Sequence, residues 1–566
     1  LRTALIAALV ASVFAAAPAT AARKVHKVSG ATVVGSDVEW LDFQGQPRIS
    51  PDGEWIIWIQ DAEVNNALAL WAARRSGGVP KRLSGTLAPG GVFKSAQFTP
   101  DSKRILYVSE QEGPLQFDLY SVPLLGTAAD GVKINPPLVG SHAVNSATIT
   151  ADGSRVVFTT STSVAQTYTL YSAPVDGSAP PTPLDGPYSA DGATSEFVIA
   201  GPRVVFGSRQ APGSPTELWS VPVVGGVAVR LSPTFAGNGE VSRLTLAPGG
   251  SRVVFRSEDA PTQPARELWS ALVQGSTGSA IRIADIAIPA GDVIGWEFSP
   301  NDTRVVFIAD RDVDEKRELY SVPVDGSASP VKLNTSLIAA GDVSYYDISL
   351  DGTRVAYDAD WAVDERREVF SVPIAGPSAG GVRLNRNLVA GETAVLQRAW
   401  ADLVEYAIAD PALTAATEVR GAPLTGPASA GWEILTAATE LSGPGVLTPD
   451  WTILRGDVLS PGAFELWTRS NDGSGSPNSL FSLLWGSVVL GEQSLVSPNG
   501  VEYFFLAAAD GDPMHLWATK VDGSQGFPAR LSPVPAGGGG VIDAVITLEM
   551  SLDGRGVLYE ADSDVP

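Results

Sequence analysis

The feature that most constrains the fold of this 566-residue chain is a short motif, Ser/Thr-Pro-Asp-Gly or a close variant, that recurs along its length. Successive copies are 48 to 54 residues apart, which is a regularity that independent domains do not produce. The chain is therefore predicted to contain ten complete repeats and a partial eleventh. The motif is marked by Asp52, Asp101, Asp152, Gly201, Gly249, Asn301, Asp351, Asp402, Asp450, Asn499 and Asp553.

Each repeat contains four short segments that are rich in β-branched and aromatic residues, and these segments are predicted to be strands. In the clearest repeat they are residues 296–299, 304–307, 318–322 and 331–333. An Asp-Gly pair such as Asp351-Gly352 can adopt positive φ at both positions, as a tight hairpin turn requires. Each repeat is thus predicted to be a four-stranded antiparallel sheet.

An aromatic residue returns at one register of the third predicted strand, with Arg420 as the single exception. Such a ladder could stack on a ligand, but a fixed register within a β-repeat favours packing between adjacent sheets. We therefore expect these side chains to be structural: Trp71, Tyr120, Tyr171, Trp219, Trp269, Tyr320, Phe370, Trp467 and Trp517.

A single sheet of this size would leave one apolar face in water, whereas radial stacking of many sheets covers it. The predicted fold class is therefore all-β, a β-propeller of about ten to eleven four-stranded blades. Two arrangements remain open. Either one large ring closes, with N-terminal strands completing the last blade, or two rings abut.

The repeats resemble the WD40-like repeats of the TolB-type propeller family of bacterial exported proteins. The resemblance is carried by "ISPDGEWIIW" (residues 49–58), "FTPDSKRILY" (98–107), "FSPNDTRVVF" (298–307) and "LVSPNGVEYFF" (495–505), and it covers nearly the whole chain. It implies a propeller fold but no particular activity. The resemblance is not complete, because TolB has an α/β domain before its propeller, whereas about thirty residues separate the expected signal peptide from the first repeat here.

The N-terminus has the pattern of a signal peptide. Arg2 precedes an apolar run over residues 4–17, and Ala19-Thr20-Ala21 has the small-x-small form that signal peptidase cleaves. We therefore assign residues 1–21 to a signal peptide, 22–45 to an N-terminal segment that could complete the last blade, and 46–566 to the propeller. No later stretch is long and apolar enough to span a membrane. A periplasmic or secreted location is expected.

Composition excludes several kinds of chemistry. The chain has no cysteine, so it has no thiolate ligand or cysteine nucleophile. Its three histidines, His26, His142 and His515, are too far apart in sequence to suggest a zinc site. A formal net charge of -23 argues against a nucleic-acid partner, because such partners are bound by Lys and Arg.

The loop between the second and third strands is strongly acidic in repeats six and seven. Its carboxylates could be oxygen ligands for calcium: Asp310, Asp312, Asp314, Asp360 and Asp364. The stretch lacks the Gly and the distal carboxylate of a helix-loop-helix calcium site, and equivalent loops in repeats three and four have no acid. We therefore expect a solvated, internally neutralised hairpin loop, with calcium as the alternative and no other cofactor.

No catalytic motif is present in the sequence, and Gly-x-Ser-x-Gly is absent. His515 precedes the third-strand aromatic register, so we interpret it as structural. The predicted function is therefore an exported, non-catalytic binding or scaffold module for a protein or an envelope polysaccharide. The alternative is the regulatory propeller of a prolyl-oligopeptidase-like hydrolase whose catalytic domain lies outside this chain.

Overall fold

The computed structural model describes most of the chain from residue 49 onward. The described residues are 38–39, 49–61, 63, 67–87, 90–138, 140–162, 168–185, 193–211, 213–235, 239–258, 266–286, 288, 291–409, 416–448, 450–456, 465–472, 474, 478–481, 488–509, 515–525, 528–531, 548–551 and 557–559. The predicted signal peptide lies outside them. No helix among these residues is long and apolar enough to cross a membrane.

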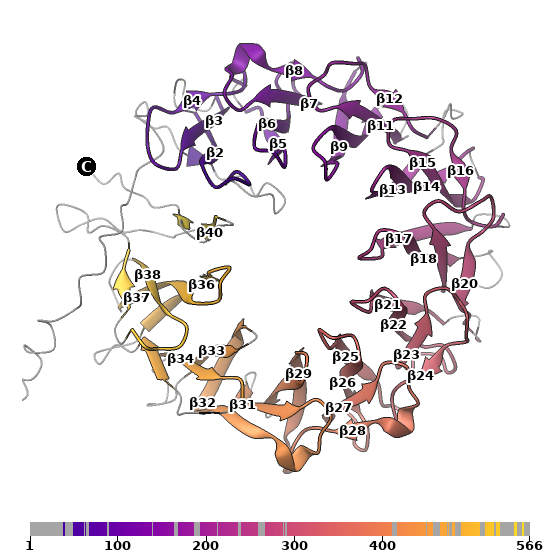
Figure 1. The fold of residues 1–566 in the computed structure, drawn as a ribbon, viewed down its shortest axis with the longest axis vertical. Helices are drawn as coiled ribbons and strands as arrows, with labels where there is room; N and C mark the ends of the chain where they lie inside the picture. Colours follow the sequence, from indigo (N-terminus) through magenta and orange to yellow (C-terminus); the bar gives the residue numbers. More distant parts are fainter. Residues whose placement is uncertain are drawn as a thin grey trace, which may run out of the picture.

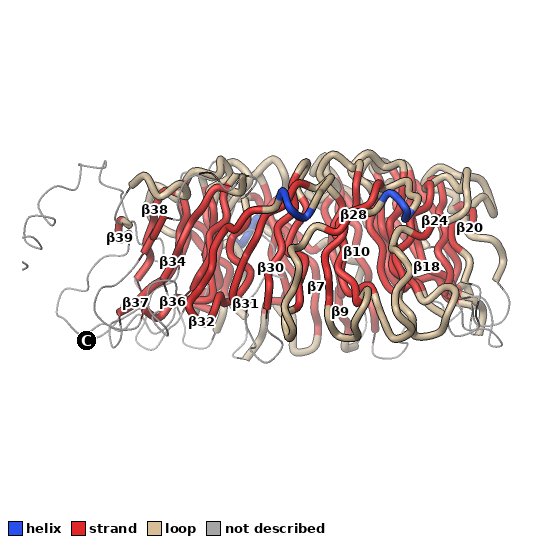
Figure 2. The backbone as a smooth tube through the Cα atoms, turned by 90° about the horizontal axis from the view of Figure 1, so that it is seen from below, coloured by secondary structure: helices blue, strands red, loops and turns tan. Residues whose placement is uncertain are grey.

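The described residues form antiparallel sheets that follow one another around a single open centre (Figure 1). Within each blade the strands lie side by side in chain order, and in most blades the first strand is the innermost. The chain is therefore an all-β, multi-blade β-propeller, as the repeats predicted. Figure 2 shows the strands running across the ring between two rims of loops.

Each of the first seven blades has four strands, and a short parallel pairing of Gln116 with His142 and of Phe117 with Ala143 joins blades 2 and 3 into one eight-stranded sheet. Their strands are β1 (Val38–Glu39), β2 (Trp55–Gln60), β3 (Ala69–Arg74) and β4 (Lys81–Arg82) in blade 1; β5 (Phe93–Phe98), β6 (Arg104–Ser109), β7 (Gln116–Pro123) and β8 (Val132–Lys133) in blade 2; β9 (His142–Ile149), β10 (Arg155–Thr162), β11 (Thr169–Pro174) and β12 (Thr182–Pro183) in blade 3; β13 (Ala193–Ala200), β14 (Arg203–Arg209), β15 (Thr216–Pro222) and β16 (Val229–Arg230) in blade 4; β17 (Glu240–Leu246), β18 (Arg252–Glu258), β19 (Arg266–Leu272) and β20 (Ile281–Ala284) in blade 5; β21 (Val293–Phe298), β22 (Arg304–Ala309), β23 (Glu318–Pro323) and β24 (Val331–Lys332) in blade 6; β25 (Val343–Ile348), β26 (Arg354–Asp360), β27 (Arg367–Pro373) and β28 (Val382–Arg383) in blade 7.

The later blades depart from this pattern, because one long strand, β32 (Trp432–Leu447), is shared by blades 8 and 9. Blade 11 shows two strands among the described residues. The remaining strands are β29 (Thr393–Ala399), β30 (Leu403–Ala409) and β31 (Ala416–Pro423) in blade 8; β33 (Trp451–Gly456), β34 (Glu465–Ser470) and β35 (Asn478–Phe481) in blade 9; β36 (Val488–Val496), β37 (Glu502–Ala509), β38 (His515–Lys520) and β39 (Ala529–Arg530) in blade 10; β40 (Leu548–Met550) and β41 (Val557–Tyr559) in blade 11. Three short 3-10 turns are η1 (Ala128–Asp130), η2 (Ser378–Gly380) and η3 (Ala428–Ala430).

Of the two arrangements that the sequence left open, the structure has the single ring. Arg75 Nη1, in the turn between β3 and β4 of blade 1, donates a 2.9 Å hydrogen bond to the Oγ of Ser551, the residue that follows β40 in blade 11. The first and last blades are thus in contact across the closure. Val38–Glu39 pairs with β2 in blade 1, while the rest of the segment expected to complete the last blade lies outside the described residues.

Neighbouring blades share their hydrophobic cores. Val306 and Leu319 of blade 6 lie in one buried cluster with Tyr357 and Phe370 of blade 7, and these four side chains are at most 5% exposed. Comparable clusters join blades 1 and 2, 2 and 3, 3 and 4, 4 and 5, 5 and 6, 7 and 8, 8 and 9, and 9 and 10. Each sheet therefore buries its faces against its neighbours.

The aromatic residue of the third strand lies directly opposite a second-strand residue, which is aromatic in most blades. Tyr320 faces Phe307 with ring centroids 5.4 Å apart, and Phe370 faces Tyr357 at the same distance. Tyr120, Tyr320, Phe370 and Trp467 are buried, whereas Trp71, Tyr171, Trp219, Trp269 and Trp517 are half-buried. At the exceptional position, Arg420 faces Tyr406.

The Asp-Gly turns differ in geometry from the tight hairpin expected. In blade 7 the Gly352 N–H donates to the Ser349 carbonyl (2.7 Å), and of the turn residues only Gly352 has positive φ, at 68°. This is a four-residue loop that ends in a left-handed residue. The expectation was wrong because the Ser349 hydroxyl donates to Asp351 (2.7 Å) and accepts from the Arg354 N–H (3.0 Å), which fixes the turn from one residue further out.

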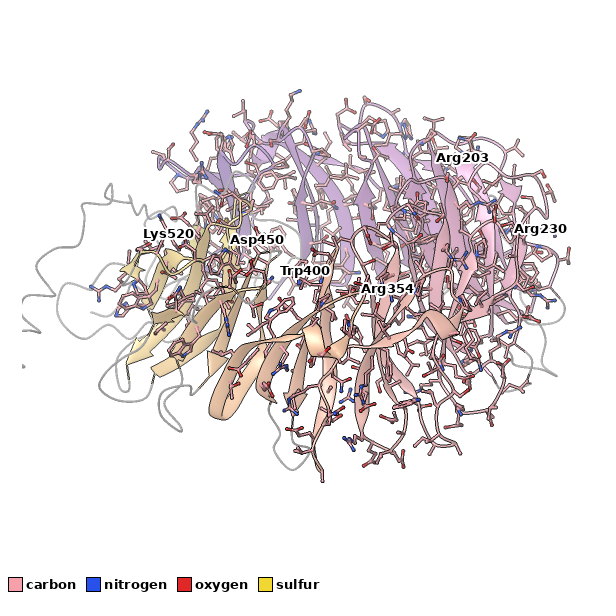
Figure 3. The ribbon with its side chains drawn as sticks, turned by 60° about the horizontal axis from the view of Figure 1, so that its bottom comes forward. Arg203, Arg230, Arg354, Trp400, Asp450 and Lys520 are labelled. Carbon is pink, nitrogen blue, oxygen red and sulfur yellow. The ribbon has the colours of Figure 1, made fainter. Side chains whose placement is uncertain are left out.

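A polar tie between the second and third strands recurs in six blades. The arginine that begins the second strand donates to a serine hydroxyl of the third, as Arg304 Nε does to Ser321 Oγ at 2.7 Å. Arg203 and Arg354, which occupy the same position in β14 and β26, are labelled in Figure 3. The other pairs are Arg104–Ser121, Arg155–Ser172, Arg203–Ser220, Arg252–Ser270 and Arg354–Ser371.

Phe307 lies in the hydrophobic cluster that joins blades 5 and 6, so truncating it tests how much this packing between blades contributes to stability. Phe307 is fully buried and stacks on Tyr320, so Phe307→Ala should lower the free energy of unfolding by about 3–5 kcal/mol. Val227→Ala is the control, since Val227 is 86% exposed and its change should stay within about 0.5 kcal/mol. Urea denaturation measures both. Equal effects would contradict the packing account.

The seam between blades 8 and 9 contains a buried carboxyl group. The Thr452 hydroxyl lies 2.7 Å from both Glu405 Oε1 and Asn471 Oδ1. Asn471 Nδ2 donates to the Thr448 carbonyl, which fixes its amide orientation. The Thr452 hydroxyl has one proton and can donate to only one of these two oxygens. Both contacts are hydrogen bonds only when the Glu405 carboxyl group is protonated and donates to the Thr452 oxygen. Burial accordingly raises the pKa of Glu405 to about 7.

This carboxyl group should make stability depend on pH. The folded protein holds the Glu405 proton above the usual glutamate range, so stability is highest below about pH 4.5 and falls as pH rises toward about 7. Glu405→Gln should remove that fall and stabilise the protein at about pH 8 by up to about 3 kcal/mol. Melting temperatures across this range measure it, with Asp402→Asn, an exposed carboxylate, as the control. An unchanged pH profile in Glu405→Gln would disprove the assignment.

Candidate functional site

The acidic loops of blades 6 and 7 have the same backbone conformation, fifty residues apart. In each, the N–H of a basic residue donates to a valine carbonyl three residues earlier, Lys316 to Val313 and Arg366 to Val363, both at 3.2 Å. The residue before the basic one has positive φ, at 63° in Glu315 and 59° in Glu365. Left-handed non-glycine residues are uncommon, so their recurrence marks a specific loop design.

The first acid of the loop holds the backbone together. Asp310, which is 9% exposed, accepts hydrogen bonds from the Asp292 N–H in the incoming connector and from the Glu315 N–H in its own loop (3.4 Å). Glu110 does the same in blade 2, where it accepts from the Val92 and Leu115 N–H groups at 3.1 and 2.7 Å. This carboxylate is therefore a clamp between two loops.

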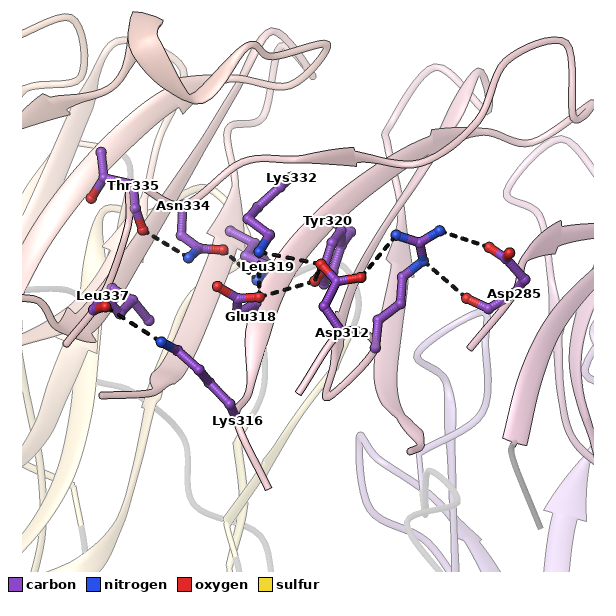
Figure 4. A network of polar contacts seen from close by, with 11 residues as sticks. Asp285, Asp312, Lys316, Glu318, Leu319, Tyr320, Lys332, Asn334, Thr335 and Leu337 are labelled. Atoms are coloured by element: carbon purple, nitrogen blue, oxygen red, sulfur yellow. Dashed lines mark hydrogen bonds and ion pairs between the residues drawn. The ribbon is translucent and has the colours of Figure 1, made fainter. Parts of the chain in front are cut away.

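The second acid, Asp312, belongs to a charge network that links neighbouring blades (Figure 4). Asp312 accepts from the Tyr320 hydroxyl (3.0 Å) and lies 3.3 Å from Lys332 Nζ. Arg311 contacts Asp312 and also donates to Asp285 of the preceding connector at 2.8 Å. Burial first, then the charges of Glu318 and Asp312, raise the pKa of Tyr320 well above its usual range. Lys332 also pairs with Glu318, so three carboxylates share two cations in this network.

Two basic residues at equivalent positions of the loops, Lys316 and Arg366, turn toward the next connector and not toward the nearby acids. Lys316 Nζ donates to the Ile338 and Leu337 carbonyls at 3.0 and 3.3 Å. Arg366 Nη2 donates to the Leu388 carbonyl at 2.8 Å. Each cation therefore secures the loop to the following blade, and it leaves the acids at the loop tip without an ion pair among the described residues.

The loop tips expose apolar side chains beside these acids. Val313 is 53% exposed, Val363 49% and Trp361 39%, and Val389 of the adjoining connector is 63% exposed. Trp361 also packs edge-on against the buried Phe370 at 6.0 Å. We call this set the tip surface: Val313, Asp314, Glu315, Trp361, Val363, Asp364, Glu365 and Val389. Sequence reasoning saw its acids but missed its apolar residues, whose signal was a valine repeated at the same place in both loops.

The residues considered as calcium ligands have different environments. Asp310 is committed to backbone hydrogen bonds and Asp312 to the network, Asp314 and Asp364 are exposed, and Asp360 is half-buried with Oδ1 unpaired. Among the described residues, no group of three carboxylate or histidine side chains could hold a metal ion. Calcium binding stays a prediction.

The histidines are placed in unrelated positions. His142 is buried, with Nε2 3.1 Å from Asp118 Oδ1 and Nδ1 2.8 Å from the Gly140 carbonyl. His515 is half-buried in β38. His26 lies outside the described residues.

No family model and no curated protein matches the chain. Among solved structures, it is similar to TolB from Acinetobacter baumannii, with 18% identity over 49% of this chain and 63% of that one and a TM-score of 0.25. It is also similar to an oligogalacturonate lyase from Vibrio parahaemolyticus, with 12% identity over 57% and 87% of the two chains and a TM-score of 0.31.

A third similar structure is the β-propeller domain of the Trilobed protease from Pyrococcus furiosus, with 12% identity over 58% of this chain and 94% of that one and a TM-score of 0.28. The match spans less than two thirds of the Acinetobacter TolB chain. These neighbours include TolB and a β-propeller domain, and the similarities say nothing about the activity of this chain.

Because Asp310 holds two loops together, its loss should lower stability much more than the loss of Asp314 in the same loop. Asp310→Ala removes the acceptor of two backbone N–H groups at a buried position, so it should destabilise the protein by about 1–3 kcal/mol. Asp314→Ala is the matched control, since Asp314 is exposed and its loss should change stability by less than about 0.5 kcal/mol. Thermal denaturation compares them. A neutral Asp310→Ala would show that the loop holds its shape without the clamp.

Proposed function

We propose that this protein is an exported, non-catalytic β-propeller that binds another protein through the tip surface. The single observation that carries the proposal is the exposure of Trp361 together with Val313, Val363 and Val389, on two loops held by Asp310, Lys316 and Arg366 and on the adjoining connector. Exposed apolar side chains rimmed by charges are typical of protein interaction sites, and tryptophan is enriched among residues that dominate binding energy.

The rigidity of the loops supports the same proposal. Because Asp310, Lys316 and Arg366 fix the loop backbones, the tip surface is arranged before a partner arrives. Little conformational entropy is then lost on association. The signal-peptide pattern of residues 1–21 supports an extracytoplasmic location, in the periplasm or outside the cell.

Retention of partners from envelope extract on the immobilised protein tests this function. The double variant Trp361→Ala, Val363→Asp should weaken retention of the partner by about thirtyfold or more, as expected for a lost hot spot. Val227→Asp is the control, because Val227 is exposed on the turn between β15 and β16 at the opposite rim.

Two results would contradict the proposal. If the double variant and the control retain the same partner equally well, the tip surface is not the binding site. If digestion of polysaccharide in the extract abolishes retention, the ligand is an envelope polymer and not a protein.

A further inference from the structure

The innermost strands of blades 6, 7 and 8 line one side of the open centre (Figure 1). They are β21, β25 and β29, and they present polar side chains that the tip surface does not use. Tyr345 of β25 is 46% exposed, and the side chain of Arg398 on β29 is 51% exposed. This wall is therefore accessible to a molecule in the centre of the ring.

Two carboxylates of blade 7 hold the innermost strand of blade 8. Asp347 Oδ2 accepts from the Ala399 N–H at 2.8 Å, and Asp358 Oδ2 accepts from the Leu396 N–H at 3.0 Å. The register of β29 shifts between Leu396 and Arg398, so the two carboxylates lie on either side of a bulge. The guanidinium of Arg398 projects beside them, with Nε 3.7 Å from Asp347 Oδ2.

One carboxylate oxygen at this seam has no partner. Asp358 is 0% exposed, and its Oδ1 is without a hydrogen bond. Asp358 lies directly opposite Tyr345 in the pairing of β25 with β26, so both side chains are on the same face of the sheet. Burial raises the pKa of Asp358 to about 6, against the lowering effect of Arg367. An ionised Asp358 is therefore short of positive charge.

Glu297 of blade 6 adds a further negative charge that is incompletely compensated. Burial first, then the charge of Asp347, raise the pKa of Glu297, while Arg398 lowers it. Burial first, then the charges of Asp347, Glu297 and Asp358, raise the pKa of the Tyr345 hydroxyl, while Arg398 lowers it. Arg367, which begins β27, lies directly opposite Asp360 at the end of β26 and lowers the pKa of both Asp358 and Asp360. The four carboxylates of Glu297, Asp347, Asp358 and Asp360 thus share the two guanidinium groups of Arg367 and Arg398.

We propose that this inner-wall cluster, formed by Glu297, Tyr345, Asp347, Asp358 and Arg398, binds a primary ammonium or guanidinium group. Such a cation would donate hydrogen bonds to the Glu297 and Asp347 carboxylates and would compensate the charge of the buried Asp358 without touching it. The half-exposed ring of Tyr345 offers its face to the same cation. A neutral sugar leaves the charge uncompensated, an anion is repelled, and no described trio of ligands suits a metal ion.

This site lies on the inner wall and does not depend on a partner at the tip surface. Its ligand could be a free amine or a basic side chain of a protein, and two probes distinguish these sources. Spermidine represents the free amine, and an acetylated tri-lysine peptide represents the side chain. The source is the one whose probe binds more tightly.

Calorimetric titration of the full chain with both probes tests the cluster. Because a bound cation favours ionised carboxylates, binding at about pH 6 should release protons, which is measured in two buffers of different ionisation enthalpy. Glu297→Gln should weaken binding about tenfold through the loss of one charge-assisted contact. Glu240→Gln is the matched control, an exposed carboxylate on the innermost strand of blade 5.

The site would be ruled out if neither probe binds at millimolar concentration. It would equally be ruled out if Glu240→Gln weakens binding as much as Glu297→Gln, because that result means attraction to the overall negative charge of the chain. Unchanged melting temperatures of both variants show that the comparison is between folded proteins.

Discussion

The burial of each sheet against the next is the interaction on which the rest of this structure depends. A sheet of four short strands covers too little apolar surface to be stable alone. Val306 and Leu319 are removed from water by blade 7, and Tyr357 and Phe370 by blade 6. Burial of one such side chain contributes about 1.5–3 kcal/mol, so every seam is worth several of these contributions. The polar contact of Arg75 with Ser551 then joins the ends of the row.

The two rims of the ring satisfy their backbone groups in different ways. At one rim, short turns do so locally, as the Ser349 hydroxyl and Asp351 carboxylate show. At the other rim, longer loops are held by carboxylates such as Asp310, which reach between a loop and the connector before it. Because these carboxylates hold the base of each loop, the residues at the loop tips are not needed to keep the loop folded. Apolar residues such as Trp361 can therefore stay exposed without loosening the blade.

The sequence predicts what is periodic and local. The strands, the blade and the position of Tyr320 opposite Phe307 all follow from a pattern that returns every repeat. The turn geometry escaped prediction because it depends on the Ser349 side chain as well as on the Asp-Gly pair. The role of Asp310 escaped because its partner, the Asp292 N–H, belongs to a connector that precedes the same blade. The ring itself depends on a contact between residues at opposite ends of the chain.

The inner-wall cluster could not be predicted from the sequence at all. Glu297, Asp347 and Arg398 come from equivalent strands of three successive blades, about fifty residues apart. No local spacing relates them, and each alone is an ordinary polar residue on an inner strand. Only the stacking of the blades brings them onto one wall.

Departures from the repeat concentrate in the same arc of the ring. Asp358 stands where blade 6 has Ile308, and Glu405 stands where blade 6 has Val306, so two seams exchange apolar burial for a buried carboxyl group. Such an exchange is unfavourable unless the group is hydrogen-bonded or protonated. The neighbouring blade supplies the hydrogen bond in each case, through the Leu396 N–H and the Thr452 hydroxyl. Blades 6 to 9 thus combine the tip surface, the inner-wall cluster and two seams with a buried carboxyl group, and a sequence under selection for packing alone would have kept those positions apolar.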